Sequence, residues 1–486
     1  MKKLDYYGEF LEKISEFLGV KLQIEAHGNC VEFIPEFNSK FIKKTLEQIG
    51  EIFEILDIIL EEYYEENNNI YFTGLIEEFS QKLIGHMVNG KLGVTKKQMN
   101  FMNTIKRICN ETYESENSNL DILLFKDKEV IPKELKKMGL DFLPFDEPKK
   151  LDEIFKEKLS LKMLNGDNLV LIIDSDFRGC GLGLNDDKEK LFKKRMLLKL
   201  RNENNKHLIS FITLLSENIL SCIDKDSINL GGNAGFNLSE EKIKKLVKYS
   251  NENMVSSKVF FNSYNKEKKE VFPYIYMEMK NKELKLYLQN SIDNYLSYRG
   301  GRWKLKSFHI LKFLIIEKFY MDSFVFHLFN DKIEKKDIIK NIIMNVDVLV
   351  CLIKNLLEEG KGGLFIILER TIKNIEKEKI FIGGNEDKSI YRRTVLKNGK
   401  NTRIQNHNFE YLKLISKVDG AVVLDNEFNL LSFGRLVKLD MNGSKEKVEG
   451  ARTAASISSS KYGLAIKVSE DKKITVWEEG IKILEI

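Results

Sequence analysis

Two short motifs near the C-terminus combine residue types that bind phosphate and metal ions. The first is Asp419-Gly420-Ala421, where an apolar strand is expected to run into the carboxylate. The second covers residues 450–456, Gly-Ala-Arg-Thr-Ala-Ala-Ser, in which a glycine opens a turn with an arginine and hydroxyl groups. A carboxylate at a strand end can ligate Mg²⁺, and a helix that begins after a glycine can offer backbone N–H groups to phosphate. The pairing predicts a site for a triphosphate and its metal ion.

The composition bounds the class of protein that positions these motifs. A chain of 486 residues exceeds one ordinary hydrophobic core, so two to three domains are expected. Hydrophobic residues make up 43% and charged residues 31%, which is typical of a globular protein. The 78 basic and 73 acidic residues nearly balance, so nucleic acid is not indicated as a partner.

The cysteine pattern favours a reducing compartment. The five cysteines are far apart and form no C-x-x-C pair, which argues against a disulfide framework or a zinc site. The first residues lack the long apolar core of a signal peptide, and the longest apolar runs are broken by Lys or Glu short of a membrane span. We therefore expect a cytoplasmic protein without a membrane segment.

Hydrophobic periodicity predicts an α/β protein with three domains. Residues 1–118 have helical spacing, residues 119–333 mix strands and helices, and residues 334–486 begin with a helix followed by strands. The polar stretch 111–119 is expected to be a boundary loop. No repeat at a fixed period is visible.

Individual strands are predicted from short apolar or alternating runs. In the middle region these are residues 121–127, 168–177 and 259–264, together with a hairpin over 273–290 that turns at Asn281-Lys282. In the last region they are residues 364–368, 379–384, 419–425, 463–469 and 473–479.

Four features of the last region occur in a characteristic order. A helix ends in EEGKGGLFIIL (358–368), KVDGAVVLD follows (417–425), FNLLSFGRLVKL suggests a strand pair with Gly434 at its turn (428–439), and EGARTAASISSSKYGLAIKVSEDKKITVWEEG completes the series (449–480). In this order they resemble the diadenylate cyclase domain, the nucleotide-binding domain of DNA-integrity-scanning proteins. The resemblance covers residues from about 340 to 486 and implies a mixed sheet flanked by helices.

The resemblance also implies a function. In this family two ATP molecules are condensed into a cyclic dinucleotide, cyclic di-AMP, by a face-to-face homodimer with Mg²⁺ or Mn²⁺. Carried over residue by residue, it places Asp419 at the metal and makes Asp419, Arg452 and Thr453 the catalytic residues. The nucleotide-binding residues that it implies are Gly420, Ala421, Gly450, Ala451, Ser456 and Glu470.

The second motif departs from the family pattern, which normally reads Gly-Thr-Arg-His-Arg-Ala-Ala. Here Arg452 keeps the first arginine, but Thr453 replaces the histidine and Ala454 the second arginine. Charge-assisted hydrogen bonds to phosphate are thereby reduced. The alternative function is therefore a catalytically degenerate sensor of a nucleotide or cyclic dinucleotide in a signalling or defence protein.

Three other patterns have plainer explanations. Residues 179–183, Gly-Cys-Gly-Leu-Gly, lack the full dinucleotide-binding spacing and predict a flexible loop. Asp174 and Asp176 after an apolar strand could ligate a metal, but a solvated turn is the simpler expectation. Residues 299–304, Arg-Gly-Gly-Arg-Trp-Lys, could clamp a phosphate, but predict a basic hairpin turn.

Overall fold

The chain is described here from a computed structural model. The described residues are 22–27, 30–35, 94–113, 116–117, 119–156, 169–184, 273–287, 294–308, 335–370, 380–382, 403–439 and 450–486, with single helical residues at 12, 15–17, 77, 80–82, 84–85, 311–312, 314–316 and 318–319. Two compact units emerge: one contains residues 44–207 and 264–307, and the other contains residues 308–486, each with short additional segments. The division of the sequence into three domains stays a prediction.

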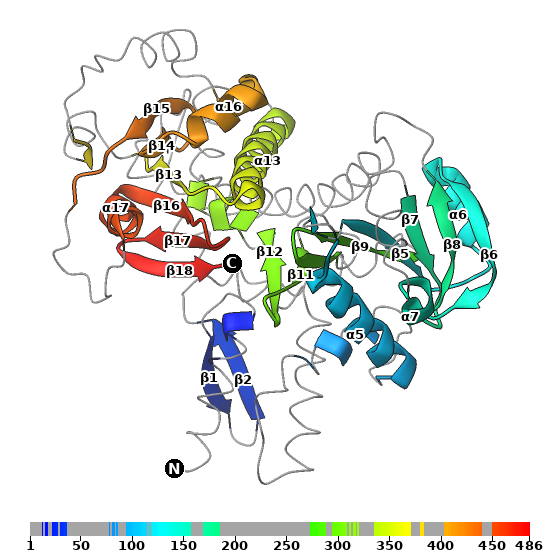
Figure 1. Cartoon of the computed structure of the whole chain (residues 1–486). Coiled ribbons are helices and arrows are strands. Elements are labelled where there is room, and N and C mark those ends of the chain that lie inside the picture. The colour runs from blue at the N-terminus through cyan, green and yellow to red at the C-terminus, as the bar shows by residue number, and fades with distance from the viewer. Residues whose placement is uncertain are drawn as a thin grey trace, which may run out of the picture. The chain divides into compact units, whose positions relative to one another are not determined.

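The first unit is built on an eight-stranded sheet (Figure 1) with the order β12-β11-β10-β9-β5-β7-β8-β6. Its strands are β5 (Leu120–Phe125), β6 (Asp141–Lys149), β7 (Leu169–Ile173), β8 (Gly179–Leu184), β9 (Tyr274–Lys280), β10 (Glu283–Tyr287), β11 (Asn294–Arg299) and β12 (Arg302–Ser307). β5 and β7 are parallel, and every other neighbouring pair is antiparallel. β5 is buried along its whole length, as expected for a central strand between two covered faces.

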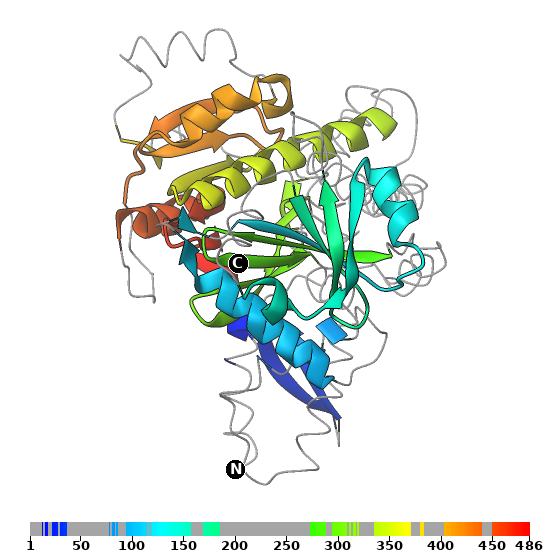
Figure 2. The ribbon, with the colours of Figure 1, turned by 45° about the vertical axis from the view of Figure 1, so that its right-hand side comes forward.

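The described helices of this unit are α5 (Lys96–Asn110), α6 (Ile131–Met138) and α7 (Leu151–Ile154). α5 begins at Thr95, whose hydroxyl accepts the Gln98 N–H, and it lies along one face of the sheet (Figure 2). α6 ends at Gly139, which adopts the left-handed conformation (φ +73°) typical of a helix C-terminus.

The second unit contains a six-stranded mixed sheet with the order β15-β14-β13-β16-β17-β18. Its strands are β13 (Gly363–Leu368), β14 (Ala421–Leu424), β15 (Leu430–Arg435), β16 (Gly463–Val468), β17 (Ile474–Glu478) and β18 (Ile481–Glu485). β13 and β14 are parallel, and the other neighbouring pairs are antiparallel. This is the mixed sheet flanked by helices that the sequence predicts.

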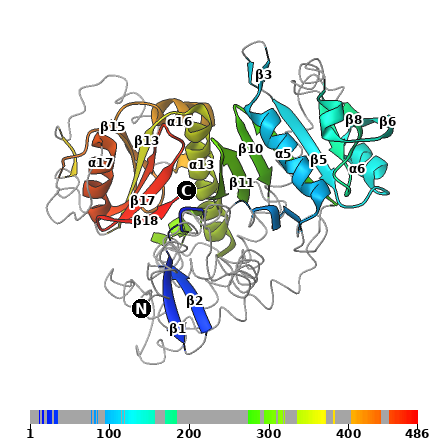
Figure 3. The ribbon, with the colours of Figure 1, turned by 60° about the horizontal axis from the view of Figure 1, so that its bottom comes forward.

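Helices cover both faces of the second sheet. α17 (Ala451–Ser459) lies on one face, and α13 (Lys335–Glu359) with α16 (Phe409–Ser416) lies on the other (Figure 3). A buried apolar cluster joins α17 to the sheet through Ile457, Ile366 and Trp477. Short 3-10 helices occupy Ile404–Asn406 and Ser460–Tyr462. The described residues contain no helix long and apolar enough to cross a membrane.

The N-terminal region is not purely helical, contrary to the expectation for residues 1–118. Two strands, β1 (Leu22–His27) and β2 (Cys30–Pro35), form a two-stranded sheet. The expected loop 111–119 contains an antiparallel pair of short strands, β3 (Thr112–Tyr113) and β4 (Glu116–Asn117). β1 alternates apolar and polar residues (LQIEAH), a strand signal that sequence reasoning overlooked beside the stronger helical periodicity, and two-residue strands such as β3 and β4 are too short to show a period.

Three further expectations are corrected. Residues 179–183 lie in β8 and do not form a flexible loop. Glycine is needed there because the neighbouring strand is close: a Cβ on Gly181 would lie 2.5 Å from the Leu143 carbonyl oxygen. Gly434 is not at a turn between two strands but inside β15 beside a bulge. Within the expected strand 379–384, Phe381 forms only an isolated bridge with Val437.

Other predictions are confirmed. The hairpin turns at Asn281 and Lys282, which both have positive φ (53° and 59°), and the basic hairpin turn over residues 299–304 joins β11 to β12. The expected strand 259–264 lies outside the described residues.

Candidate functional site

The candidate site lies at one end of the second sheet. β13 and β14 run in parallel, with Leu364 opposite Ala421, so both strands begin at this end. β16 is antiparallel to β13 and ends here, with Val468 opposite Gly363. The residues just before β13 and β14 and just after β16 are therefore brought together by the topology.

Asp419 precedes a strand and does not follow one, contrary to the sequence expectation. The residues before it form α16, which ends at Ser416, and β14 begins at Ala421. The side chain of Asp419 is 95% exposed, so its carboxylate is open to solvent and to a ligand.

Gly420 is required by the turn that presents Asp419. Its φ is +102°, a region that L side chains rarely adopt. A Cβ at this position would also lie 2.5 Å from the backbone carbon of Gly434 and 2.8 Å from the backbone nitrogen of Arg435. The Asp-Gly dipeptide therefore fixes both the turn and its close approach to β15.

Arg452 joins the two motifs. It is the second residue of α17, which begins after Gly450 (φ +87°). Its guanidinium nitrogens lie 3.5 Å from Asp419 Oδ1 and 3.2 Å from Glu470 Oε1. A Cβ on Gly362 would fall within 2.7 Å of the guanidinium carbon, so Gly362 leaves room for this group. Three predicted site residues are thus in contact, with the carboxylates of Asp419 and Glu470 on either side of the Arg452 guanidinium.

The ion pairs around Arg452 are exposed, with 41% of its side chain and 70% of the Glu470 side chain accessible. Pairs of this kind contribute only about 0–1 kcal/mol, because water and salt screen them. A phosphate group can therefore take over the guanidinium at little cost.

Thr453 and Ser456 are held by internal hydrogen bonds. Thr453 Oγ1 accepts a hydrogen bond from Lys467 Nζ at 2.9 Å, and Ser456 Oγ donates to the Arg452 carbonyl at 2.7 Å. Ser456 is fully buried, so its hydroxyl lies inside the helix, while Ala451 is exposed at the helix start.

Lys467 is a neighbour of the site that sequence reasoning missed. It lies in β16 on the face covered by α17, and burial lowers its pKa while the nearby carboxylates of Asp471 and Glu485 raise it. A lysine on a strand face that is otherwise apolar is the signal that could have identified it.

The donor set limits how a cation could be held. Among the described residues, no group of three or more His, Cys, Asp or Glu side chains is arranged to hold a metal ion. Mg²⁺ commonly uses one or two carboxylates together with substrate phosphates and water. The exposed carboxylate of Asp419 fits that mode, with the remaining ligands supplied by a nucleotide and solvent.

Asp174, Asp176 and residues 299–304 belong to the first unit and form no part of this site. Asp174 and Asp176 lie in the loop between β7 and β8, and Trp303 is buried, with its indole N–H donating to Glu77. Trp303 therefore serves the packing of the first unit.

Neither a protein-family model nor a curated protein matches the chain. Two solved structures are similar over part of it, each at 15% identity and a TM-score of 0.22. One is a double mutant of DacA from Staphylococcus aureus, which covers 30% of this chain and 89% of its own. The other is a hypothetical membrane spanning protein from Bacillus cereus, which covers 36% of this chain and 92% of its own. At these values the two likenesses carry no argument about activity.

Proposed function

We propose that residues 334–486 bind ATP with Mg²⁺ or Mn²⁺ and condense two ATP molecules into a cyclic dinucleotide. The observation that carries the proposal is the meeting of Arg452, Asp419 and Glu470 at one end of the sheet. Gly362 leaves room for the guanidinium, and Gly420 and Gly450 provide the positive φ of the turns before β14 and α17. The resemblance to diadenylate cyclases supplies the reaction.

Asp419 would hold the divalent cation, which neutralises phosphate charge when bound. Arg452 then exchanges its exposed carboxylate partners for phosphate oxygens and orients the triphosphate. Thr453 accepts from Lys467 and keeps its own O–H to donate toward a phosphate. In the reaction, the 3′-hydroxyl of each ATP attacks the α-phosphate of the other, each hydroxyl loses its proton, and two pyrophosphates leave. Alignment and charge neutralisation, not a protein nucleophile, accelerate such a transfer.

Incubation of the pure protein with ATP and Mg²⁺ or Mn²⁺, followed by chromatography of the nucleotides, tests this reaction. The Asp419→Asn variant should lose product formation by on the order of a thousandfold, because the carboxylate acts on the metal. Glu410→Gln is the control, since Glu410 is an exposed carboxylate in the first turn of α16 that contacts none of Asp419, Arg452 and Glu470 in the described structure. Equal product from the wild type and Asp419→Asn would refute the proposal.

A second function is supported by the departure at 453–454. Only Arg452 remains of the three basic groups of the family motif, and the Thr453 hydroxyl is engaged by Lys467. Such a site could bind a nucleotide or cyclic dinucleotide as a sensor without turning it over. Calorimetric binding of ATP or cyclic di-AMP by a protein that forms no product with either metal would favour the sensor.

A further inference from the structure

Six of the eight strands of the first sheet have the same order and directions as the six strands of the second sheet, and β6 and β12 are additional edge strands of the first. In chain order β5, β7, β8, β9, β10 and β11 form a sheet with the spatial order β8-β7-β5-β9-β10-β11, and β13 to β18 form β15-β14-β13-β16-β17-β18. In both sheets the first two strands of the chain are parallel and all other pairs are antiparallel. A helix, α5 or α13, precedes the first strand of each set.

The registers also agree. The first residue of β5 pairs with Met279, the sixth residue of β9, and the first residue of β13 pairs with Val468, the sixth residue of β16. The second residue of β5 pairs with Val170, as the second residue of β13 pairs with Ala421. A one-residue slip would reverse every side chain of a strand, so agreement in register is more demanding than agreement in order.

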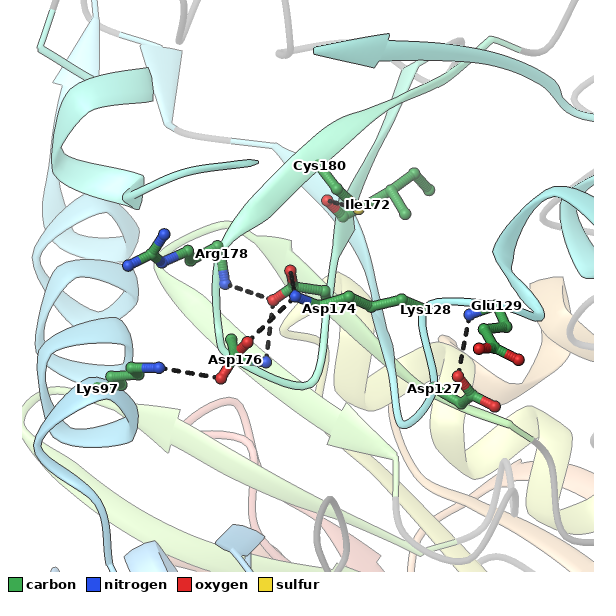
Figure 4. Close-up of polar contacts among 9 residues, drawn as sticks. All are labelled: Lys97, Asp127, Lys128, Glu129, Ile172, Asp174, Asp176, Arg178 and Cys180. Carbon is green, nitrogen blue, oxygen red and sulfur yellow. Dashed lines mark hydrogen bonds and ion pairs between the residues drawn. The ribbon is translucent and has the colours of Figure 1, made fainter. Parts of the chain in front are cut away.

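The loops after β7 and β14 have the same conformation. Asp174 Oδ1 accepts the backbone N–H groups of the second and fourth residues after it at 2.9 and 3.0 Å (Figure 4), and Asp425 Oδ1 does the same at 2.9 and 2.9 Å. The third residue after each aspartate is a phenylalanine with positive φ, 59° at Phe177 and 61° at Phe428. Positive φ is uncommon for a bulky residue, so its recurrence at one place in the loop is informative.

The strands that follow these loops, β8 and β15, begin at equivalent positions, a constant number of residues apart in the sequence. Ile173 pairs with Gly179, and Leu424 pairs with Leu430. A bulge lies next to each pair, between Ile172 and Ile173 in one sheet and between Val423 and Leu424 in the other. The equivalent residues up to this bulge are 251 positions apart, as for Asp174 and Asp425 and for Phe177 and Phe428. A second bulge, found in β15 alone, then shifts the register by one residue, so that Ala421 pairs with Arg435 whereas Val170 pairs with Gly183.

In each of the two loops, the second residue after the aspartate is acidic and forms ion pairs with two basic side chains. Asp176 lies 3.0 Å from Lys97 Nζ and 3.1 Å from Lys128 Nζ, and these contacts lower the pKa of its carboxyl (Figure 4). The counterpart Glu427 lies 2.7 Å from Arg370 and 3.1 Å from Arg403. Asp174 and Asp176 therefore have the structural role of their counterparts and are not a separate metal site.

The two sheets differ at the end that holds the candidate site in the second sheet. Leu169, the counterpart of Gly420, is already in the strand and pairs with Leu184, whereas β14 begins only after Gly420. The glycine turn that presents Asp419 is thus replaced by extended strand. The sequence position that corresponds to Asp419 holds Asn168.

The turn that carries Glu470 is also changed. β16 and β17 are joined by residues 469–473, whereas β9 and β10 are joined by Asn281 and Lys282 alone. The short turn places an amide and an ammonium group where the second copy has carboxylates. The carboxylates at this end of the strands β5 and β10, Asp121 and Glu283, are buried and accept hydrogen bonds from Tyr276 and Ser297, so they do not replace the exposed carboxylates of Asp419 and Glu470.

We propose that the chain contains two copies of one fold and that only the C-terminal copy binds a metal-bound nucleoside triphosphate. The inference rests on the proposed function, because it assigns the nucleotide to the site around Asp419 and Arg452. One nucleotide is then bound per chain, and the second ATP of a cyclisation must come from a second copy of the chain.

Titration calorimetry of the full chain with 3′-deoxy-ATP and Mg²⁺ tests this stoichiometry, since that analogue lacks the attacking hydroxyl. We expect one molecule per chain, with binding weakened at least roughly tenfold in Asp419→Asn, where a charged contact worth more than 1.4 kcal/mol is lost. The control Lys282→Glu changes the corresponding turn of the first copy and should leave binding unchanged.

The outcomes separate the inference from the function on which it rests. Two molecules per chain, one of them retained in Asp419→Asn, would overturn the inference and leave the proposed function intact. No binding by a folded protein at millimolar analogue would overturn both.

Discussion

At the residue scale, the candidate site depends on a glycine that leaves space for a side chain as much as on the charged groups themselves. Arg452 can lie beside both Asp419 and Glu470 because Gly362 offers no Cβ to obstruct its guanidinium. The same three charges form weak, exposed pairs that a ligand can replace. Sequence reasoning named these three residues, but it could not show that one arginine contacts both carboxylates.

Gly420→Ala should destabilise the second unit more than an ordinary glycine substitution. The added Cβ meets the backbone of Gly434 at 2.5 Å and Gly420 has φ +102°, so both a clash and strain arise. We expect a loss of about 2–4 kcal/mol in the free energy of unfolding, measured by urea denaturation.

Gly480→Ala is the matched control for this effect. Gly480 also has positive φ (80°), but no atom lies within 4 Å of its added Cβ. This variant should lose only about 1 kcal/mol. Equal losses in the two variants would contradict a steric requirement at Gly420.

At the element scale, the two loops after β7 and β14 show what a single buried aspartate does for a strand connection. Asp174 is fully buried, and its carboxylate accepts two backbone N–H groups that would otherwise lack partners in the loop. Its Oδ2 lies 3.1 Å from Lys128 Nζ, which compensates the buried charge. Asp425 completes its own set differently, by accepting from Asn429 Nδ2 at 3.0 Å.

Asp174→Ala and Asp425→Ala should each destabilise the unit that contains them. Each substitution removes the acceptor of two backbone N–H groups, and the expected loss is about 2–3 kcal/mol in the free energy of unfolding. Hydrogen exchange should show faster exchange of the amides at 176 and 178 in one variant and at 427 and 429 in the other. Asp176→Ala is the control, since its half-exposed carboxylate should contribute less than about 1 kcal/mol. Unchanged amide protection in both variants would refute this role.

The same elements show how far the sequence predicts the fold. Long apolar periodicity correctly predicted the helix from residue 335, and the positive-φ hairpin at 281–282 was predicted from its turn residues. β8 was missed because Gly179, Gly181 and Gly183 have the composition of a loop. Only the close packing of β6, with the Leu143 carbonyl 2.5 Å from a Cβ on Gly181, explains them.

The duplication was also missed, although its trace is present in the sequence. An aspartate, an acidic residue and a phenylalanine recur as Asp-x-Asp-Phe at 174–177 and Asp-x-Glu-Phe at 425–428. Such a short match has no weight until the strand registers on both sides agree. The repeat is a structural one, with few positions fixed by local turn geometry.

At the scale of the whole chain, comparison of the two sheets distinguishes the features that form the fold from those that form the candidate site. The order of six strands, the register of the central strands and the loop with its ion pairs are common to both copies. The glycine turn and the acidic turn occur in the described residues of the second copy alone. On the proposed function, one copy of the fold carries the nucleotide site and the other does not. With a single competent site per chain, a reaction between two nucleotides requires two chains with their sites facing each other.

Mixing the wild type with Asp419→Asn tests this requirement. At constant wild-type concentration, a roughly ninefold excess of the variant should lower the rate of cyclic dinucleotide formation to about a tenth, because most wild-type chains then have a partner with a defective site. The rate is measured by chromatography of the nucleotides, and an equal excess of an unrelated protein is the control. Sedimentation of two differently labelled preparations establishes that the chains exchange partners under these conditions. An unchanged rate despite exchange would show that each chain forms product without a second competent site.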